Sequence, residues 1–424
     1  MKQILAILII LTLVAAVSAQ TKITLKMGDN QPDRTTGFGA VIEQINAEFK
    51  AANPTVEFVT ESYPDQPWQQ KVKIYVASKQ LPDVLKYWSF SSLLKPLVDA
   101  KMAEPLNKST FDKFGYIPGA LEANMIGGKL YGVPISADMW VIFYNKQLFK
   151  DAGIDKVPTT IDELLATVDK FKAKGIIPIS TDGKDAWPLC ITFDELVWRI
   201  SGDSTLPQKA LNRKAKFTDP VFVQAAKLLQ QLTAPATGLF QADLMVSDYG
   251  AARNLFGQGR AAMYLMGAWE MGLGTDTNFS KDFTGNVDAF KFPVITGGKG
   301  KLDDLFAWYG GNYVINASSK NKAMAIKYLE FYAKRFPAVA WEKQASFPAQ
   351  KVAPRDSDTP VAKTLLGIAA SAKATSGTAS LDLSTPQFKD DIQRAISELC
   401  VGLTTPEEFC KKIDLAAEKA SKQK

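Results

Sequence analysis

The 424-residue sequence contains no histidine. Sites that need an imidazole are therefore excluded, among them Ser-His-Asp and Cys-His nucleophiles and histidine-ligated zinc. Cysteine is scarce, with three residues and no C-x-x-C pair, so neither a cysteine-rich metal site nor a dithiol redox site is indicated. Lysine and arginine exceed aspartate and glutamate by only six, and no basic run is present, which argues against binding to nucleic acid.

The composition is that of a globular protein with a full core. Hydrophobic residues make up 46% of the chain and charged residues 22%. The length is about three times that of a common domain, which favours two domains or a pair built from discontinuous segments. Several of the eight tryptophans lie in loop-like stretches. Tryptophan in loops points to a binding surface rather than to a catalytic centre.

The N-terminal segment has the pattern of a secretory signal peptide. Lys2 precedes an apolar run over Ile4–Val17, and Val17-Ser18-Ala19 supplies the small residues of a cleavage site. This run is too short for a membrane-spanning helix, which needs roughly 20 residues, so a cleaved signal over residues 1–19 is favoured over an uncleaved anchor. Gln20 follows instead of cysteine, which disfavours a lipid anchor. We therefore expect a soluble protein that is secreted across the inner membrane into the periplasm.

Two of the cysteines, Cys400 and Cys410, flank a turn that contains Gly402 and Pro406. In an oxidising compartment a disulfide between them is possible, and free thiols are the alternative. Cys190 follows Trp187-Pro188-Leu189 and is expected to be a buried free thiol.

Apolar residues recur with the alternation of strands and the period of helices through most of the chain. In the first 130 residues the pattern predicts strands over 23–27, 56–59 and 81–85, and helices around 41–49, 72–76 and 91–98. Thr160 and Glu163 form a capping box that opens a helix ending near Lys174. Further strands are predicted over 141–144, 176–179, 288–295 and 313–315, and mainly helical structure over 193–285, 323–336 and most of the C-terminal part. Alternating strands and helices are typical of an α/β fold with a mostly parallel sheet.

Four segments resemble one protein family in their residues and in their order. They are Gly128–Pro134 with Phe143–Ile154, Phe256–Met263 followed by Trp269, Gly310–Ile315, and Asn53-Pro54 with Leu81–Val84. Together they resemble the bacterial extracellular solute-binding proteins of family 1, which supply sugars to ABC importers and include the maltose-binding protein. One departure is Ile161, which stands where the family usually has a tryptophan.

The resemblance implies a two-lobed α/β clamshell of the type II periplasmic binding proteins, in which each lobe is a sheet flanked by helices. Lobe 1 is expected over residues 20–136 plus 290–340, and lobe 2 over residues 137–289 plus 341–424. The hinge segments that join the lobes are expected near Pro134–Asp138, Asp288–Phe292 and Phe336–Phe347.

The resemblance also implies a function. We expect a non-enzymatic binding protein that captures a carbohydrate in the cleft and delivers it to a membrane permease. Within the carbohydrates, an oligosaccharide is the expected ligand. It is expected to act as a monomer without a cofactor or metal. One alternative is a polyol or glycerol-phosphate ligand, for which Arg34, Arg253 and Arg355 are the cations to inspect. Another is a secreted glycoside hydrolase, which would need two carboxyl groups about 5–9.5 Å apart.

A sugar needs flat apolar platforms for its faces and polar groups for its hydroxyls, which Trp and Tyr, and Asp and Asn, supply. Trp269 matches the cleft tryptophan of the family, and Asp138 lies on the first crossing segment, where a hinge cap is the alternative role. Trp68 lies in a proline-rich loop, where packing at a helix start is the alternative. The predicted ligand contacts are Asp29, Asn30, Trp68, Tyr87, Trp88, Asp138, Trp140, Trp187, Trp269, Trp308, Tyr309 and Asn312.

Other motifs receive structural interpretations. Trp198 and Trp341 lie in helical patterns and are expected in the core. Gly297–Lys301 lacks the spacing of a phosphate-binding loop and is expected to form a turn. The paired acids Asp194-Glu195 and Asp303-Asp304 are expected on solvated faces.

Overall fold

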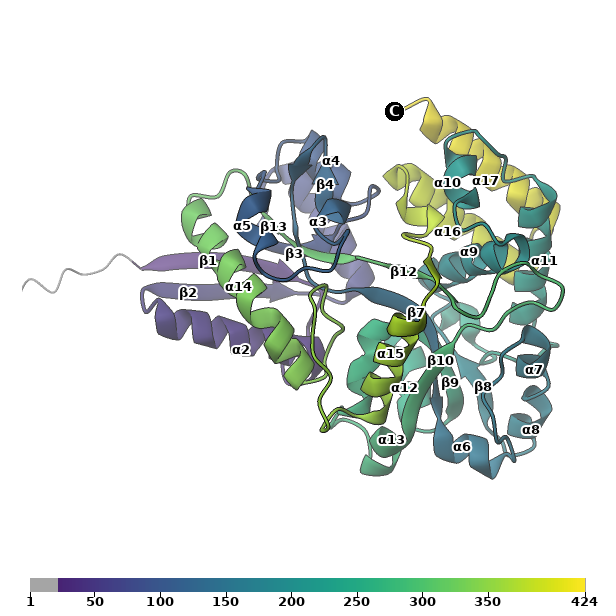
Figure 1. Cartoon of the computed structure of the whole chain (residues 1–424). Coiled ribbons are helices and arrows are strands. Elements are labelled where there is room, and N and C mark those ends of the chain that lie inside the picture. The colour runs from purple at the N-terminus through teal and green to yellow at the C-terminus, as the bar shows by residue number, and fades with distance from the viewer. Residues whose placement is uncertain (1–21, 424) are drawn as a thin grey trace, which may run out of the picture.

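The computed structural model describes residues 22–423, so the predicted signal peptide at residues 1–19 lies outside the described residues. The chain forms two α/β lobes, each built around its own sheet, as Figure 1 shows. No helix among residues 22–423 is long and apolar enough to cross a membrane.

The sheet of lobe 1 is mostly parallel, with β13 running antiparallel to its neighbours β3 and β6. In spatial order it contains β2 (Val56–Ser62), β1 (Ile23–Asp29), β3 (Val84–Trp88), β13 (Gly311–Ile315) and β6 (Val133–Pro134). Its helices are α2 (Gly37–Ala52), α3 (Asp65–Ser78), α4 (Leu94–Asp99), α5 (Lys108–Asp112) and α14 (Lys322–Glu342). A short ribbon of β4 (Met125–Ile126) and β5 (Lys129–Leu130) follows the turn η1 (Glu122–Asn124).

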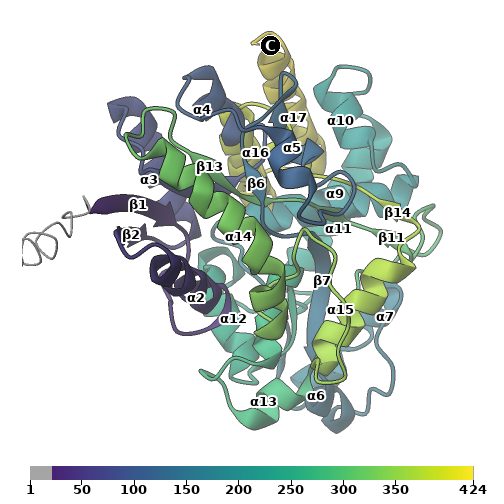
Figure 2. The same ribbon diagram turned by 60° about the vertical axis from the view of Figure 1, so that its left-hand side comes forward.

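Alternation along the strands divides the lobe 1 core into two layers. Val84 and Tyr313 point into the layer that α2 and α14 cover, whereas the neighbouring Leu85 and Val314 point into the layer of α3 and α4. Figures 1 and 2 both show α14 lying beside α2 on one face of this sheet.

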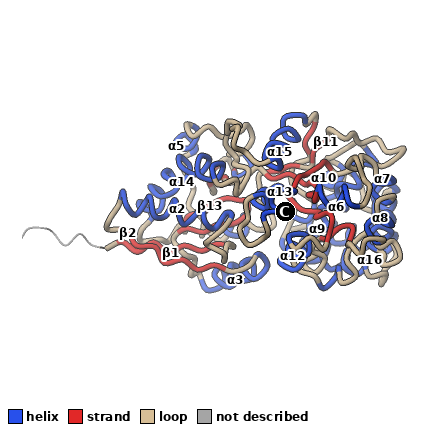
Figure 3. Tube along the Cα trace, turned by 90° about the horizontal axis from the view of Figure 1, so that it is seen from below, coloured by secondary structure: helices blue, strands red, loops and turns tan. Residues whose placement is uncertain are grey.

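The sheet of lobe 2 has the order β10 (Val287–Lys291), β7 (Asp138–Asn145), β9 (Ala261–Gly267) and β8 (Ile177–Ser180), and β12 (Ala307–Trp308) pairs with the start of β7. A two-stranded ribbon pairs β11 (Asp304–Leu305) with β14 (Ala374–Thr375). The helices are α6 (Lys146–Asp151), α7 (Ile161–Leu165), α8 (Val168–Lys172), α9 (Trp187–Ser201), α10 (Leu206–Leu211), α11 (Pro220–Thr233), α12 (Tyr249–Gly257), α13 (Lys281–Asn286), α15 (Pro360–Ser371), α16 (Pro386–Cys400) and α17 (Pro406–Ser421), with turns η2 (Leu244–Val246), η3 (Ala268–Gly274) and η4 (Ser380–Asp382). Figure 3 shows these elements gathered on the side away from β1 and β2.

Strand β9 was missed by the sequence patterns, which predict mainly helix over 193–285. All seven of its residues are buried, so the run has no alternation of apolar and polar residues. Such a run cannot be distinguished from a buried helix by periodicity alone. The predicted capping box is confirmed, since Thr160 accepts from the backbone N–H of Glu163 at the start of α7.

Three segments cross between the lobes side by side. The backbone N–H of Ile135 donates to Gly311, that of Ala137 to Phe347, and that of Ala349 to Ile135, each at 2.9 Å. The second crossing thus lies near residues 309–311 rather than near 288–292, because β10 pairs with β7 inside lobe 2. This pairing moves the expected lobe boundary at residue 290 toward the C-terminus by almost 20 residues.

The structure contradicts the possible disulfide. Cys400 and Cys410 are both free and buried, as is Cys190. Cys400 is the last residue of α16, whereas Cys410 lies one turn inside α17 and packs into the same core. Burial raises the pKa of each of the two thiols to about 12. They therefore act as small apolar core residues.

Asp194 and Glu195 correct a second expectation, because both are wholly buried rather than solvated. Trp198 and Trp341 are confirmed as core residues, each 3% exposed. The turn expected over Gly297–Lys301 is present and packs on the end of α9: a Cβ on Gly298 would lie 2.4 Å from the carbonyl oxygen of Arg199. Glycine is required there by close packing, not by a phosphate.

Candidate functional site

One edge of the lobe 2 sheet gathers polar and aromatic residues from three strands. Strand β7 begins at Asp138, and its Trp140 lies opposite Gly267, where antiparallel β9 ends. Strand β8 runs parallel to β9 and ends at Ser180, so its carboxyl end lies at the same edge. The start of β7 and the loops after β8 and β9 therefore meet, as ligand-binding loops do in open α/β sheets.

The facing edge of lobe 1 is built in the same way. Strands β1 and β3 are parallel and end at Asp29 and Trp88, and Gly311 at the start of antiparallel β13 lies opposite Trp88. The two edges approach each other, because Ser92 after β3 donates to Asp382 of η4 at 2.8 Å. Lys73 of α3 also lies 3.7 Å from Asp390 of α16. Residues that follow these strand ends therefore lie between the lobes.

Four tryptophans form a continuous wall on the lobe 2 side, which we call the tryptophan wall: Trp140, Trp187, Trp269 and Trp308. The ring of Trp269 lies at its centre, with centroids 6.3 Å from Trp140, 5.8 Å from Trp187 and 6.0 Å from Trp308. Trp140 and Trp187 contact each other edge to face at 6.1 Å. Trp187 and Trp269 are half-buried, so part of each ring stays accessible.

The position of Trp269 is fixed from both sides. Gly267 allows the ring to fold back over the end of β9, since a Cβ there would lie 2.0 Å from the ring. The next residue, Glu270, is buried and accepts from Tyr249 and, at 2.8 Å, from Arg253. Arg253 in turn donates to Asp276 at 2.7 Å. This buried network holds the loop that carries Trp269.

Several buried polar atoms of this region have no hydrogen-bond partner in the protein. They include Oδ1 of Asp138, Oδ2 of Asp182 and the indole nitrogens of Trp140 and Trp187. Two are acceptors and two are donors. A buried polar group without a partner costs about 1–3 kcal/mol. Such atoms on one wall indicate a site that a polar guest completes.

The pKa values of two carboxyl groups in the site are raised toward neutral pH. Burial raises the pKa of Asp138 to about 6, although Ser136, Lys86 and the backbone N–H of Gly310 favour its ionised form. Burial likewise raises the pKa of Asp65 to about 6, against the attraction of Lys389 and Lys86. Lys86 of lobe 1 therefore acts on carboxylates of both lobes, and its own pKa is lowered by burial.

Most of the predicted residues come together here, and that they contact a ligand stays a prediction. Trp88 lies beside Tyr87, with ring centroids 5.6 Å apart. Asn30 is half-buried, and its Oδ1 accepts from Lys86 at 2.5 Å. The hydroxyl of Tyr309 donates to the carbonyl of Pro118 at 3.0 Å.

Three predicted contacts are fully buried and already hydrogen-bonded within lobe 1. Trp68 is 0% exposed, and its indole nitrogen donates to the carbonyl of Lys86, so it belongs to the α3 core and the expected contact is wrong. Asp29 is also 0% exposed and accepts from Arg34, Ser62 and the backbone N–H of Gln31. Asn312 is equally buried and donates to Asn124 at 2.7 Å, although its own Oδ1 has no partner.

The patterns missed Asp65, Lys86, Asp182 and Asp185. Asp182 follows the carboxyl end of β8 by two residues, and a position just after a predicted strand is the same signal that selected Trp88. Asp65 is the first residue of α3, and only the folded chain shows that it faces lobe 2, where Asp185 raises its pKa.

The cations inspected for a phosphate ligand are already paired. Arg34 donates to Asp29 at 2.6 Å, Arg253 to Glu270 and Asp276, and Arg355 to Asp358 at 2.9 Å. Each of the three therefore already has a carboxylate counter-ion, and only Nη1 of Arg34 among their buried terminal nitrogens has no hydrogen-bond partner. Within residues 22–423, no group of three or more Cys, Asp or Glu side chains is arranged to hold a metal ion.

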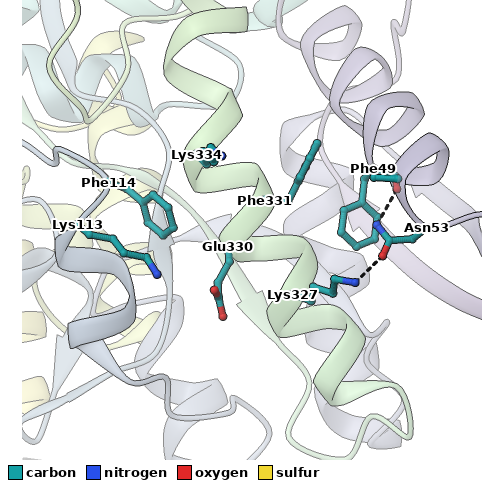
Figure 4. A pocket seen from close by; sticks show the side chains of 9 residues that line it. Phe49, Asn53, Lys113, Phe114, Lys327, Glu330, Phe331 and Lys334 are labelled. Atoms are coloured by element: carbon teal, nitrogen blue, oxygen red, sulfur yellow. Dashed lines mark hydrogen bonds between the residues drawn. The ribbon is translucent and has the colours of Figure 1, made fainter.

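A separate cavity lies on the outer side of lobe 1. Figure 4 shows it between α2, α14 and the loop after α5. Its volume is about 670 Å³. Its aromatic residues are Phe49, Phe114 and Phe331, and its Lys327 donates to Asn53 at 2.6 Å. Because every lining residue belongs to lobe 1, this cavity is distinct from the region between the lobes.

Stability of the unliganded protein is expected to fall as the pH rises from about 4 to about 8. Burial raises the pKa of Asp182 from 3.8 to about 8. The folded state then binds more protons than the unfolded state over this range. The contribution of Asp182 to stability is therefore complete below the pKa it has in the unfolded chain, and it is lost as the pH rises through the pKa it has in the folded protein. The variant Asp182→Asn should flatten this fall by at least about 1 kcal/mol, since one pKa unit is about 1.4 kcal/mol. Urea unfolding of both proteins at both ends of the range measures the difference, and equal slopes would contradict it.

Comparison with known proteins gives consistent results. A family model described as bacterial extracellular solute-binding protein matches residues 32–335. An uncharacterized ABC transporter extracellular-binding protein of Pyrococcus horikoshii is 28% identical over 239 residues, covering 56% of this chain and 51% of that protein. A maltotriose-binding protein of Pyrococcus abyssi is 25% identical over 300 residues, covering 69% of this chain and 59% of that protein. The match thus spans little more than half of each of these two relatives.

The fold is also that of solved structures. One, from work on xylan utilization by the thermophilic bacterium Caldanaerobius polysaccharolyticus, has a TM-score of 0.83 and 28% identity, and the match covers 93% of this chain and 99% of that one.

Proposed function

Because this chain belongs to the family of bacterial extracellular solute-binding proteins, we propose that it is the binding component of an ABC importer for a carbohydrate, an oligosaccharide. The ligand binds between the lobes, against the tryptophan wall, and the loaded protein delivers it to a membrane permease. The observation that carries this proposal is the combination of that wall with buried polar atoms that lack partners.

A sugar satisfies both parts of the site. Its C–H faces pack on indole rings, and burying such a ring with its guest adds on the order of 0.5–1.5 kcal/mol beyond area burial. A hydroxyl can both donate and accept. It can therefore donate to Oδ1 of Asp138 and accept from an indole nitrogen such as that of Trp140, which an apolar ligand cannot do.

Binding is coupled to closure in this proposal. The three hydrogen-bonded crossing segments provide a common hinge about which the lobes can rotate, a motion already known for periplasmic binding proteins. Moving from mostly open to mostly closed needs about 5.5 kcal/mol of differential affinity. A ligand that touches Trp269 of lobe 2 and Trp88 of lobe 1 gains contacts only when the lobes are closed.

Other ligands have less support. A glycerol phosphate needs an available cation, whereas Arg34, Arg253 and Arg355 are each paired with a carboxylate. A neutral polyol has no flat face to match the tryptophan wall. For a glycoside hydrolase, the family and its structural neighbours give no support, since they are binding proteins. The family description and the predicted signal over residues 1–19 support a location outside the inner membrane.

The proposal is tested by titration calorimetry with a panel of mono- and oligosaccharides, followed by small-angle scattering with the best ligand. We expect saturable binding of at least one oligosaccharide, no release of reducing ends, and a smaller radius of gyration at saturation. Absence of binding across the panel, or turnover of the sugar, would overturn the proposal. An unchanged radius would overturn closure alone.

A further inference from the structure

The loop after β8 brings two carboxyl groups into contact. The backbone N–H of Asp185 donates to Oδ1 of Asp182 at 3.0 Å, which folds the loop back on itself. The loop is held against its neighbours, since Gly183 and Lys184 both donate to the carbonyl of Ser247. Asp182 is 0% exposed, whereas Asp185 is half-buried and close enough to Asp65 of lobe 1 to raise the pKa of that carboxyl group. We call these two residues the aspartate pair.

The aspartate pair holds a proton in the unliganded protein. The two acidic residues lie close together, since the backbone N–H of Asp185 donates to Oδ1 of Asp182, and two buried carboxyl groups side by side are not both ionised without cost. Burial is the main cause that raises the pKa of Asp182 to about 8, and it raises that of Asp185 as well. Oδ2 of Asp182 has no donor elsewhere in the protein.

Like charges surround the aspartate pair. Asp65, from α3 of lobe 1, and Asp248, at the start of α12, both act on it. Two cations of this region are paired with other carboxylates, Lys389 with Asp382 at 2.7 Å and Lys184 with Asp248 at 3.5 Å, whereas Lys86 donates to the neutral Asn30 at 2.5 Å and is set against the carboxyl group of Asp65. The buried phenol of Tyr264 on β9 also interacts electrostatically with Asp182. The local charge balance therefore favours a cation and opposes an anion.

The tryptophan wall adjoins the aspartate pair. Trp187 follows Asp185 by two residues at the start of α9, and its ring contacts Trp140 and Trp269. Independently of the carboxyl groups, the indole nitrogens of Trp140, which is 1% exposed, and of Trp187 have no partner. A guest that reaches these donors also lies beside the aspartate pair.

We propose that the ligand carries a protonated amine, as an amino sugar does, and that this ammonium group binds against Asp182 and Asp185 of lobe 2 with Asp65 of lobe 1 facing it. This inference rests on the proposed function. The ammonium donates to Oδ2 of Asp182 and to the carboxylate of Asp185, and the proton shared by the pair leaves to the solvent. A neutral hydroxyl at the same place leaves that proton bound, and a carboxylate or phosphate is repelled.

The test uses trimers of one linkage that differ only at C2: the β-1,4 trimers of glucosamine, N-acetylglucosamine and glucose. Titration calorimetry is run at a pH at which the amine is protonated, in two buffers of different ionisation enthalpy. We expect the glucosamine trimer to bind about tenfold more tightly than either neutral trimer and to be the only one that releases a proton. If no trimer binds, the corresponding monosaccharides, glucosamine and galactosamine with their acetylated forms, are compared in the same way.

Variants separate the amine site from the rest of the cleft. Asp182→Asn and, on the opposite lobe, Asp65→Asn should each reduce the amine preference to less than about threefold, with thermal unfolding as the check on folding. Asp155→Asn, at an exposed position of lobe 2, should leave the preference unchanged.

Equal or tighter binding of the neutral member of each matched set overturns the amine site and leaves the proposed function intact. The same conclusion follows if only neutral sugars of the wider panel bind. Failure of every sugar to bind overturns the proposed function itself.

Discussion

Replacing Trp269 with alanine is expected to weaken carbohydrate binding by at least about 30-fold, or about 2 kcal/mol. This is the largest effect on affinity that any single ring of the site should give. Trp269 is the one tryptophan that contacts the other three rings of the tryptophan wall. Its loss removes a platform for the ligand and also the support for Trp187.

Two further variants make the Trp269→Ala result specific. Trp269→Phe keeps an apolar ring and should recover most of the affinity. Phe331→Ala removes a half-buried ring that packs on Phe49 at 5.4 Å, on the outer side of lobe 1. That control should lower the melting temperature and leave the affinity within about twofold. If Trp269→Ala binds the sugar as tightly as the natural protein does, the tryptophan wall is not the platform.

Sequence patterns located the aromatic part of this site because position along the chain carries that information. Trp88 follows the strand predicted to end at Leu85, Trp269 follows Gly267-Ala268 in a predicted loop, and Trp140 comes just after the first predicted crossing segment. In α/β folds such positions face ligands whatever the rest of the chain does. The strands themselves were predictable where polar and apolar residues alternate, and β9 was not, because it is buried throughout.

The remaining errors concern the tertiary contacts of a residue, which the periodicity of the sequence does not reveal. Trp68 has the loop context of a binding residue, but its indole nitrogen meets the carbonyl of Lys86, 18 residues away. The raised pKa of Asp182 depends on burial and on the nearby Asp185 and Asp65, and these residues come together only in the folded chain. Asp194 and Glu195 have the sequence of a solvated face, but residues 188–199 of α9 are all buried. A helix that is covered on every side must bury its charges as well.

That buried helix carries the prediction with the largest effect on stability. Arg199→Met is expected to lower the free energy of unfolding by about 3–5 kcal/mol. Arg199 is 1% exposed, and its Nη2 lies 2.8 Å from Oε1 of Glu195 one turn earlier. The same guanidinium donates to the carbonyls of Phe292 and Lys301, and at 2.9 Å to that of Asp304, which fastens the 292–304 segment to α9.

The loss of stability in Arg199→Met arises mainly from the unpaired carboxylate of Glu195. Without Arg199, Glu195 is a buried carboxylate with no counter-ion, and burial already raises its pKa to about 7 in the natural protein. Protonation then becomes the less costly state, so the deficit of Arg199→Met should shrink as the pH falls from about 8 to about 5. Chemical denaturation across this range measures both the size of the loss and its sign.

The double variant Glu195→Leu plus Arg199→Met decides between a charge effect and a packing effect. If the unpaired carboxylate causes the loss, removing it as well should recover at least about 2 kcal/mol of the single-variant deficit, because replacing a whole buried ion pair is often close to neutral. The carbonyls of Phe292, Lys301 and Asp304 lose their donor in both variants, so any deficit that remains in the double variant measures that clamp. A double variant as unstable as Arg199→Met alone, with no dependence on pH, would assign the entire effect to the carbonyl contacts and none to Glu195.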